Sequence, residues 1–220
     1  MKIAVLSDTH NLLRPEVMEH LRGCGAILHG GDICRPWILE RLRETAPVFA
    51  VRGNNDGDWA ADLPRTADLE IAGLRVCMAH RKRDLPADLR PYDLAVYGHT
   101  HVYSESRLPR DGKAPTLLLN PGSCGPRRFL QSVTMSVVTA DGDGWTAERV
   151  DLALPAAAAP SGADLRRMIE TVVRETGKGR GPDEIARRYG MDPALTEQIA
   201  RLYLTHPGVT ADGIMTKLGL

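Results

Sequence analysis

Apolar and polar positions in the first hundred residues follow two alternating patterns. Short runs rich in valine, isoleucine and leucine are apolar throughout, as buried strands are. Between these runs, two segments place apolar residues at helical spacing and carry a proline near their first turn, at Pro15 and Pro36. The expected strands are 2–7, 26–30, 48–53 and 93–98, and the expected helices are 14–23 and 35–44. This alternation predicts a largely parallel sheet covered by helices.

From residue 67 onward the pattern is mainly that of strands. Segment 67–80 has two apolar runs around Ala72-Gly73, which predicts a hairpin. Further runs at 104–109, 116–120 and 132–152 are broken by Asp-Gly turns. We therefore predict an α/β (α+β) domain over residues 1–153, built from two packed mixed β-sheets flanked by helices in an αββα sandwich.

The last third of the chain has a different character. Residues 154–163, "LPAAAAPSGA", indicate a linker, and residues 164–220 indicate a small helical, helix-turn-helix-like appendage around Gly190. Residues 161–220 contain nine lysines and arginines against eight aspartates and glutamates, a net charge of only +1. We expect this appendage to pack on the core, recruit a protein partner or form a homo-oligomer, with nucleic-acid binding as the alternative.

Composition narrows the setting without naming the function. The chain has 220 residues, is 43% hydrophobic and 25% charged, and carries no net charge, so bulk charge indicates neither nucleic-acid nor membrane binding. Its four cysteines form no CxxC pair, which argues against a structural zinc site and a disulfide framework. The chain opens on a strand-like run and not on a signal peptide, and no run approaches a membrane span. We expect a reduced, cytoplasmic protein.

Most strand-like runs lead into turns with side chains that can bind a metal ion. Carboxyl ends of parallel strands share one edge of a sheet, so we expect these side chains to surround one pocket. In chain order they are Asp8 and His10, then Asp32, then Asn54 with Asn55 and Asp56, then His80, and last His99 and His101. Each motif alone is an ordinary polar turn, but the ordered series is a strong signal.

This mixture of groups suits catalysis on phosphate esters. Imidazole and carboxylate ligands together hold zinc, manganese, iron or cobalt, and no thiolate is among them. Seven candidate ligands exceed the needs of one ion. Two ions about 3.5–4 Å apart, sharing one carboxylate, would use them all, would clamp a phosphoryl group and would activate a water molecule.

The series "SDTH … GGD … GNND … AH … GHTH" resembles the calcineurin-like metallophosphoesterase superfamily, in particular its small bacterial and archaeal phosphodiesterase branch. "LNPGSCGPRR" at 119–128 also corresponds, and the resemblance covers roughly residues 1–151. It implies a phosphodiesterase that hydrolyses phosphate diesters through a metal-bridging hydroxide. The implied cofactors are two divalent transition-metal ions, manganese first, with nickel, iron, cobalt or zinc as alternatives. One ion would be held by Asp8, His10, Asp32 and His101, and the other by Asp32, Asn54, His80 and His99, with Asp32 bridging.

The chain departs from the family pattern at two places. Many members have a histidine where this chain has Asn55, and an amide cannot act as a general acid, so we expect leaving groups that depart without a proton. Asp56 then has no neighbouring histidine to orient, and we expect it to hold a ligand or cap a turn. His80 precedes "RKR" where glycine-rich sequence is usual, which predicts a different pocket wall.

Four side chains are candidates for contacts with substrate or with the metal ligands. Substrate binding is assigned to Asn54, Asn55 and Arg127, although a solvated surface arginine is an equal alternative for Arg127. His29, before the GGD turn, is either bonded to a ligand or a buried structural histidine. Two other functions stay open: a nuclease that binds through the C-terminal helices, and a metal-free scaffold like the retromer subunit of this fold, which the full ligand set disfavours.

Overall fold

The structure is a computed structural model that describes residues 1–127, 132–141, 144–152, 162–191 and 193–218. They divide into two compact units, one within residues 1–154 and the other containing all described residues from 162 onward. Of the predicted linker, residues 154–161 lie outside the described residues, and a helix begins at Gly162. No helix in the described ranges is long and apolar enough to cross a membrane.

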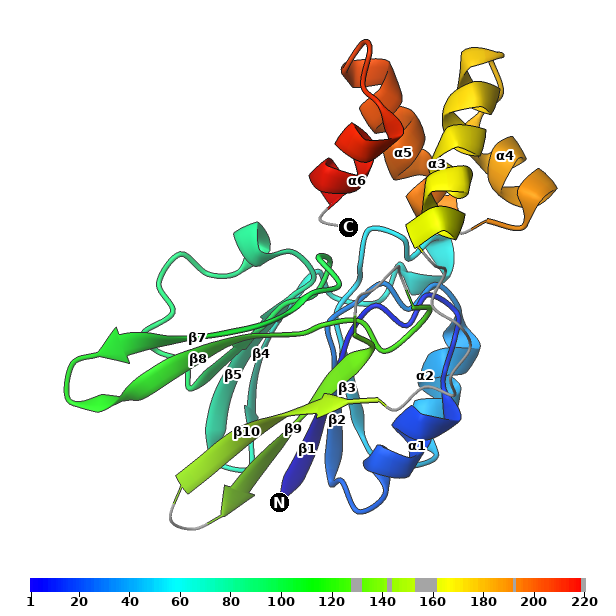
Figure 1. Ribbon diagram of the computed structural model, residues 1–220. Coiled ribbons are helices and arrows are strands. Elements are labelled where there is room, and N and C mark those ends of the chain that lie inside the picture. The colour runs from blue at the N-terminus through cyan, green and yellow to red at the C-terminus, as the bar shows by residue number, and fades with distance from the viewer. Residues whose placement is uncertain (128–131, 142–143, 153–161, 192, 219–220) are drawn as a thin grey trace. The chain divides into compact units, whose positions relative to one another are not determined.

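The first unit consists of two mixed β-sheets (Figure 1), as the sequence predicts. One sheet has the order β10-β9-β1-β2-β3, from strands β1 (Lys2–Leu6), β2 (Ala26–His29), β3 (Val48–Ala50), β9 (Thr134–Asp141) and β10 (Gly144–Asp151). The other has the order β4-β5-β6-β8-β7, from β4 (Thr66–Ile71), β5 (Leu74–Ala79), β6 (Leu94–Val96), β7 (Tyr103–Arg110) and β8 (Lys113–Pro121). In each sheet three neighbouring strands are parallel, and the remaining strands pair antiparallel.

The apolar run of β1 is buried on both of its faces. Ile3 and Val5 belong to the core between the two sheets, whereas Ala4 and Leu6 face a second core under the helices. Those helices are α1 (Pro15–Leu21) and α2 (Pro36–Arg43), which lie against the first sheet on the side away from the second sheet (Figure 1). A strand covered on both faces has no polar alternation, which is why its sequence is continuously apolar.

The hairpin predicted around Ala72-Gly73 is confirmed. β4 pairs antiparallel with β5, with Ile71 opposite Leu74, so the loop contains two residues. Ala72 has φ of 52° and Gly73 has φ of 77°, which is the left-handed geometry that two-residue hairpin loops require. This unit also has two short 3₁₀ helices, η1 (Asp58–Ala60) between β3 and β4 and η2 (Lys82–Asp84) between β5 and β6.

The second unit is helical, with α3 (Gly162–Gly177), α4 (Pro182–Tyr189), α5 (Pro193–Thr205) and α6 (Ala211–Leu218). The predicted apolar face of α3 supplies Leu165, Ile169 and Val172 to its core. Gly190, with φ of 63°, ends α4 in the left-handed conformation that commonly terminates helices. The next helix, α5, begins at Pro193.

Candidate metal centre

The turns that follow five strands bring the predicted ligands together. Asp8 and His10 follow β1, Asp32 follows β2, and Asn54 follows β3, all from the first sheet. His80 directly follows β5, and the two histidines of "GHTH" follow β6, so these come from the second sheet. The pocket therefore lies where strand ends of two sheets meet, and the expectation that one sheet edge supplies every residue is wrong.

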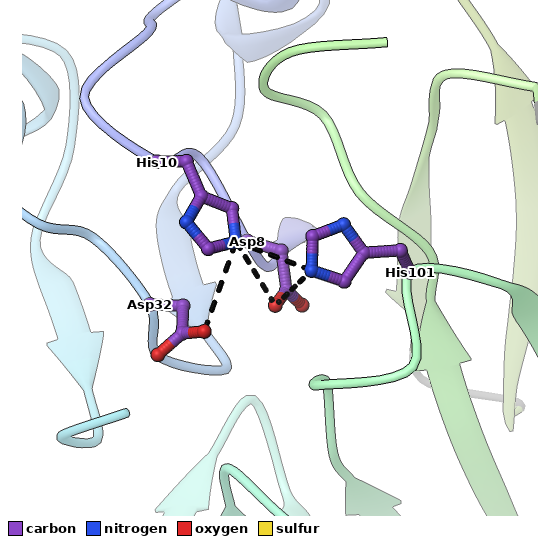
Figure 2. Close-up of side chains that lie close together, drawn as sticks. All are labelled: Asp8, His10, Asp32 and His101. Carbon is purple, nitrogen blue, oxygen red and sulfur yellow. Dashed lines mark hydrogen bonds and ion pairs between the residues drawn. The ribbon is translucent and has the colours of Figure 1, made fainter. Parts of the chain in front are cut away.

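Asp8, His10, Asp32 and His101 form the first group (Figure 2). Nε2 of His10 lies 3.1 Å from Nε2 of His101, which in turn lies 3.2 Å from Oδ1 of Asp8. Nε2 of His10 is also 3.7 Å from Oδ1 of Asp8 and 3.7 Å from Oδ2 of Asp32. In the described part of the chain, the buried Oδ1 of Asp8 accepts no hydrogen bond. Two imidazole nitrogens and two carboxylate oxygens that converge in this way fit a divalent cation.

Asp32, His80 and His99 form the second group, so Asp32 belongs to both. Oδ1 of Asp32 is 3.4 Å from Nε2 of His80, which lies 3.1 Å from Oδ1 of Asn54. Nδ1 of His80 lies 2.8 Å from the carbonyl oxygen of Gly30 and must donate to it. Nε2 is therefore the ring nitrogen that faces the centre, as in metal-binding histidines whose other nitrogen donates to a carbonyl. Both groups fit divalent cations, and the two oxygens of Asp32 face different groups.

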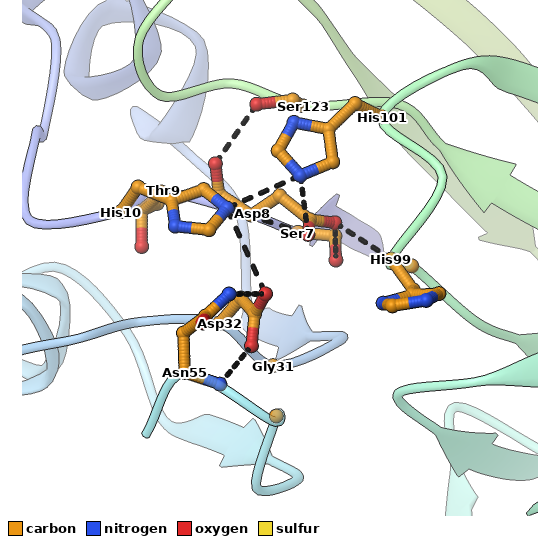
Figure 3. Close-up of polar contacts among 12 residues, drawn as sticks. Ser7, Asp8, Thr9, His10, Gly31, Asp32, Asn55, His99, His101 and Ser123 are labelled. Atoms are coloured by element: carbon orange, nitrogen blue, oxygen red, sulfur yellow. Dashed lines mark hydrogen bonds and ion pairs between the residues drawn. The ribbon is translucent and has the colours of Figure 1, made fainter. Parts of the chain in front are cut away.

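Neighbouring donors fix the orientation of the two carboxylates (Figure 3). Oδ2 of Asp8 accepts hydrogen bonds from the Ser7 hydroxyl at 2.6 Å and from the backbone N–H of His99 at 3.0 Å. Asp32 accepts from the backbone N–H of Asn55 at 2.8 Å and from its side-chain amide at 2.7 Å. The side chain of Asn55, expected to meet substrate, thus also positions the shared carboxylate.

Asp56 caps the turns behind the centre, which confirms one of its two predicted roles. Its buried carboxylate accepts backbone hydrogen bonds from Asp32, Ile33, Cys34 and Gly53, at 3.0, 2.8, 2.6 and 2.7 Å respectively. These four N–H groups lie on two different turns. Asp56 therefore ties the turn that carries Asp32 to the turn that carries Asn54.

His29 is a fully buried histidine that holds two turns of the centre. The N–H of Gly31 donates to its Nδ1 at 3.2 Å, so the ring proton resides on Nε2 and is donated to the Thr9 hydroxyl at 3.1 Å. Burial lowers the pKa of His29 to about 4, against an opposing effect of Asp56 and Asp8. The imidazole is therefore neutral and bonds residues adjacent to candidate ligands, not the ligands themselves.

The electrostatics of the group favour ionised carboxylates. Burial by itself raises the pKa of Asp8, but contacts with His10 and His101 outweigh it and leave the pKa well below its usual range. For Asp32 burial likewise raises the pKa, but His80 and the backbone N–H of Asn55 lower it by more, so the net shift is downward. The two buried carboxylates are therefore ionised, which favours the binding of cations at the site.

The backbone of the ligand turns is strained. Five of the seven candidate ligands have positive φ in the left-handed region, which residues with a Cβ rarely adopt. They are Asp8 at 55°, His10 at 44°, Asp32 at 56°, His99 at 72° and His101 at 61°. Close approach of the turns adds a second constraint, because a Cβ on Gly98 would lie 1.9 Å from the Ser7 hydroxyl oxygen.

The segment "GSCG" lines the first turn, and sequence reasoning did not assign it a contact. The Ser123 hydroxyl donates to the carbonyl oxygen of Asp8 at 2.8 Å, and the backbone N–H of Cys124 donates to that of Ser7 at 3.2 Å. Arg127 is exposed at the end of this segment, and its contact with substrate stays a prediction. The motif "LNPGSCGPRR" marks this segment in the sequence, but it does not indicate which residues the segment contacts.

A two-sheet sandwich with carboxylates, imidazoles and an amide at the meeting strand ends is the architecture of a metal-dependent phosphoesterase. The chain belongs to the calcineurin-like phosphoesterase superfamily, whose domain model matches residues 1–143. Members of this family use divalent metal ions, and the two groups above are its candidate ligands in this chain.

Related proteins agree with this assignment. A probable metallophosphoesterase of Methanothermobacter thermautotrophicus is 34% identical over 170 residues, 70% of this chain and 95% of that protein. A metallophosphoesterase structure from Sphaerobacter thermophilus aligns with 91% of this chain and 99% of its own, at a TM-score of 0.51 and 20% identity. Vps29 of Entamoeba histolytica, solved with Zn²⁺, aligns with 70% of this chain and 100% of its own, at a TM-score of 0.52 and 22% identity. The two structural likenesses show the shared fold.

Proposed function

We propose that the protein hydrolyses phosphate diesters with two divalent transition-metal ions. The observation that carries the proposal is the position of Asp32, whose two oxygens face two separate groups of ligands. Asp8, His10 and His101 would complete one metal site, and Asn54, His80 and His99 the other. A shared carboxylate between two sites is the arrangement that dinuclear hydrolases use.

The ions, when bound, lower the pKa of a water molecule and offset negative charge on the phosphoryl group. The protein side chains keep that arrangement rigid. Ser7 and the backbone of His99 orient Asp8, while Asn55 orients Asp32 through two hydrogen bonds. Mixed oxygen and nitrogen ligands without thiolate suit manganese, which we propose as the metal, before nickel, iron, cobalt or zinc.

Add-back of metals to stripped protein tests the proposal. Hydrolysis of bis(p-nitrophenyl) phosphate is measured as manganese, nickel, cobalt, zinc or iron is restored, with metal content determined in parallel. Asp32→Ala should remove both turnover and the binding of two ions, because that carboxylate is shared. Asp62→Ala, at an exposed carboxylate of the same unit, should keep both. Turnover that persists in Asp32→Ala would refute the dinuclear proposal. Wild-type protein that binds no metal would also refute it and would favour a scaffold role.

The order of helices in the second unit supports a nuclease as the second candidate. α4, the left-handed Gly190 and α5 follow the order of a helix-turn-helix, and Arg187 and Arg188 of α4 are exposed. Affinity of the full chain for oligonucleotides should then fall steeply with salt and fall again in Arg187→Glu/Arg188→Glu. Affinity that is undetectable or independent of salt would favour a protein partner or self-association as the role of these helices.

A cytoplasmic setting is also part of the proposal. Four free cysteines support it, because thiols stay reduced in the cytoplasm.

A further inference from the structure

Two cavities open from the second group of ligands, and their walls are basic. A cavity of about 590 Å³ begins at Asn54 and His80 and is also lined by three arginines, Arg52, Arg65 and Arg81. A neighbouring cavity of about 390 Å³ begins at His99 and shares Arg81. Its remaining charged lining residues are Lys82 and Arg83. Arg81, the first residue of the segment "RKR" after His80, is therefore common to both cavities, and the other two residues of that segment line only the second.

The carboxylates of these cavities do not neutralise the basic side chains. Asp56 is committed to four backbone N–H groups. Asp84 is exposed and lies 3.7 Å from Arg83. Over the part of the chain that the structure describes, Arg65 forms neither a hydrogen bond nor an ion pair. Five cationic side chains against two carboxylates therefore leave the two cavities with positive charge for an anionic ligand.

Arg81 connects this charge to the ligand group. Its Nε lies 3.4 Å from Oδ1 of Asn54, and that oxygen lies 3.1 Å from Nε2 of His80. An anionic group bound by Arg81 would thus be a direct neighbour of a phosphoryl group held at His80 and Asn54. In a diphosphate, two phosphoryl groups are neighbours across a single bridging oxygen, and a guanidinium suits such a phosphate through paired N–H donors.

The side chain of Asn55 leads independently to the same kind of substrate. Its side-chain amide donates a hydrogen bond to Oδ2 of Asp32 at 2.7 Å, and an amide cannot protonate a leaving alkoxide. A phosphate monoester leaves without protonation near neutral pH, because its second pKa is about 6. The missing acid is therefore no obstacle when the leaving group is itself a phosphate.

We propose that the basic cavities select diphosphate-linked substrates, in which the attacked phosphorus carries one ester and one bridge to a second phosphate. The inference rests on the proposed phosphodiesterase activity and names its substrate class. Hydroxide forms a new bond to one phosphorus, and the bond from that phosphorus to the bridging oxygen breaks. The electron pair stays on the bridging oxygen, so the products are two phosphate monoesters, one of which keeps the proton of the hydroxide. Arg81 and Arg65 hold the departing phosphate.

Binding of a pair of nucleotides to the full-length, manganese-loaded protein tests the subsite without turnover. By calorimetry, adenosine 5′-(α,β-methylene)diphosphate, which cannot be cleaved at its P–C–P link, is compared with adenosine 5′-monophosphate. We expect the diphosphate analogue to bind about tenfold more tightly, and Arg65→Gln/Arg81→Gln to remove most of this gain. Arg107→Gln, at an exposed arginine of β7 outside both cavities, should keep it. An equal gain in the double variant, or no gain in the wild type, would overturn the proposal.

Turnover separates the failure of this inference from the failure of the proposed function. P1,P2-di(adenosine-5′) diphosphate and bis(p-nitrophenyl) phosphate are offered to the same manganese-loaded protein. We expect both to be cleaved, and the ratio of their kcat/KM values to fall about tenfold in Arg65→Gln/Arg81→Gln. Cleavage of the aryl diester without the diphosphate would overturn the substrate class and leave the phosphodiesterase intact. Cleavage of neither would overturn the phosphodiesterase proposal, and the nucleotide binding gain would then decide the subsite alone.

Discussion

Replacing Asp56 with asparagine would change one oxygen of a buried carboxylate into an NH₂ group. Oδ1 accepts the N–H groups of Ile33 and Cys34, and Oδ2 accepts those of Asp32 and Gly53. In either orientation of the amide, the NH₂ group therefore faces two N–H donors. Two hydrogen bonds are lost, and two buried donors are left without an acceptor.

The size of the effect follows from the charge of the acceptor. A hydrogen bond to a charged group contributes about 1.5–3 kcal/mol, so the loss of two predicts a decrease in the free energy of unfolding of about 3–6 kcal/mol. Typical domains have a free energy of unfolding of about 5–15 kcal/mol, so the variant should be near the limit of folding. The remaining two bonds also weaken, because the acceptor is no longer charged.

Urea denaturation followed by tryptophan fluorescence measures the free energy of unfolding of the first unit of the protein. All three tryptophans, Trp37, Trp59 and Trp145, lie in the first unit, so the signal is not mixed with unfolding of the helices. Asp62→Asn, at an exposed carboxylate, should change the free energy of unfolding by no more than about 0.5 kcal/mol. A decrease of less than about 1 kcal/mol in Asp56→Asn would show that the four contacts do not stabilise the turns to this extent.

Three further predictions concern other parts of the centre. His29 has a pKa of about 4 in the folded state against 6.5 unfolded, so the unfolded state binds a proton first as pH falls. Stability should therefore decrease by about 2 kcal/mol from about pH 7 to about pH 5, a slope that His29→Asn removes and the exposed control His20→Asn keeps in urea titrations. Gly98→Ala would place a Cβ 1.9 Å from the Ser7 hydroxyl and should abolish metal binding by calorimetry, whereas Gly57→Ala, with its nearest atom at 3.9 Å, should not. Asn55→His should raise the rate on alkyl relative to aryl diesters, and an unchanged ratio would show that the absent acid does not limit those substrates.

The sequence predicted the two-sheet fold because burial on both faces leaves a continuous apolar pattern. It also predicted the hairpin, since Ala72-Gly73 supplies the left-handed φ that the loop needs. It did not predict which sheet each strand would join. β6 looked like a continuation of the first sheet, yet it pairs with β5 and β8. Apolar runs look alike in either sheet, and the choice depends on pairing partners that no local pattern specifies.

The structure gathers the seven predicted ligands, and residue type after each strand was the signal. The contacts that hold them were largely out of reach of sequence reasoning. Ser123 is 115 residues from its acceptor at Asp8, and the N–H of His99 is 91 residues from the same aspartate. A capping role for Asp56 could be predicted, because this residue lies two residues after Asn54 in a polar turn. Even so, its four donors became evident only in three dimensions.

Strain and support are linked at this centre. Five left-handed residues with side chains cost roughly 1–2 kcal/mol each, about 5–10 kcal/mol together, which is comparable with the stability of a whole domain. Such turns persist only where other contacts hold them, and the bonds of Asp56, His29 and Ser7 lie directly behind them. The same turns bring Asp8 close enough to Asp32 to disfavour ionisation of the buried Asp32 carboxyl. Cations between them would relieve that repulsion, so the strained backbone and the charges of the site favour metal binding for the same structural reason.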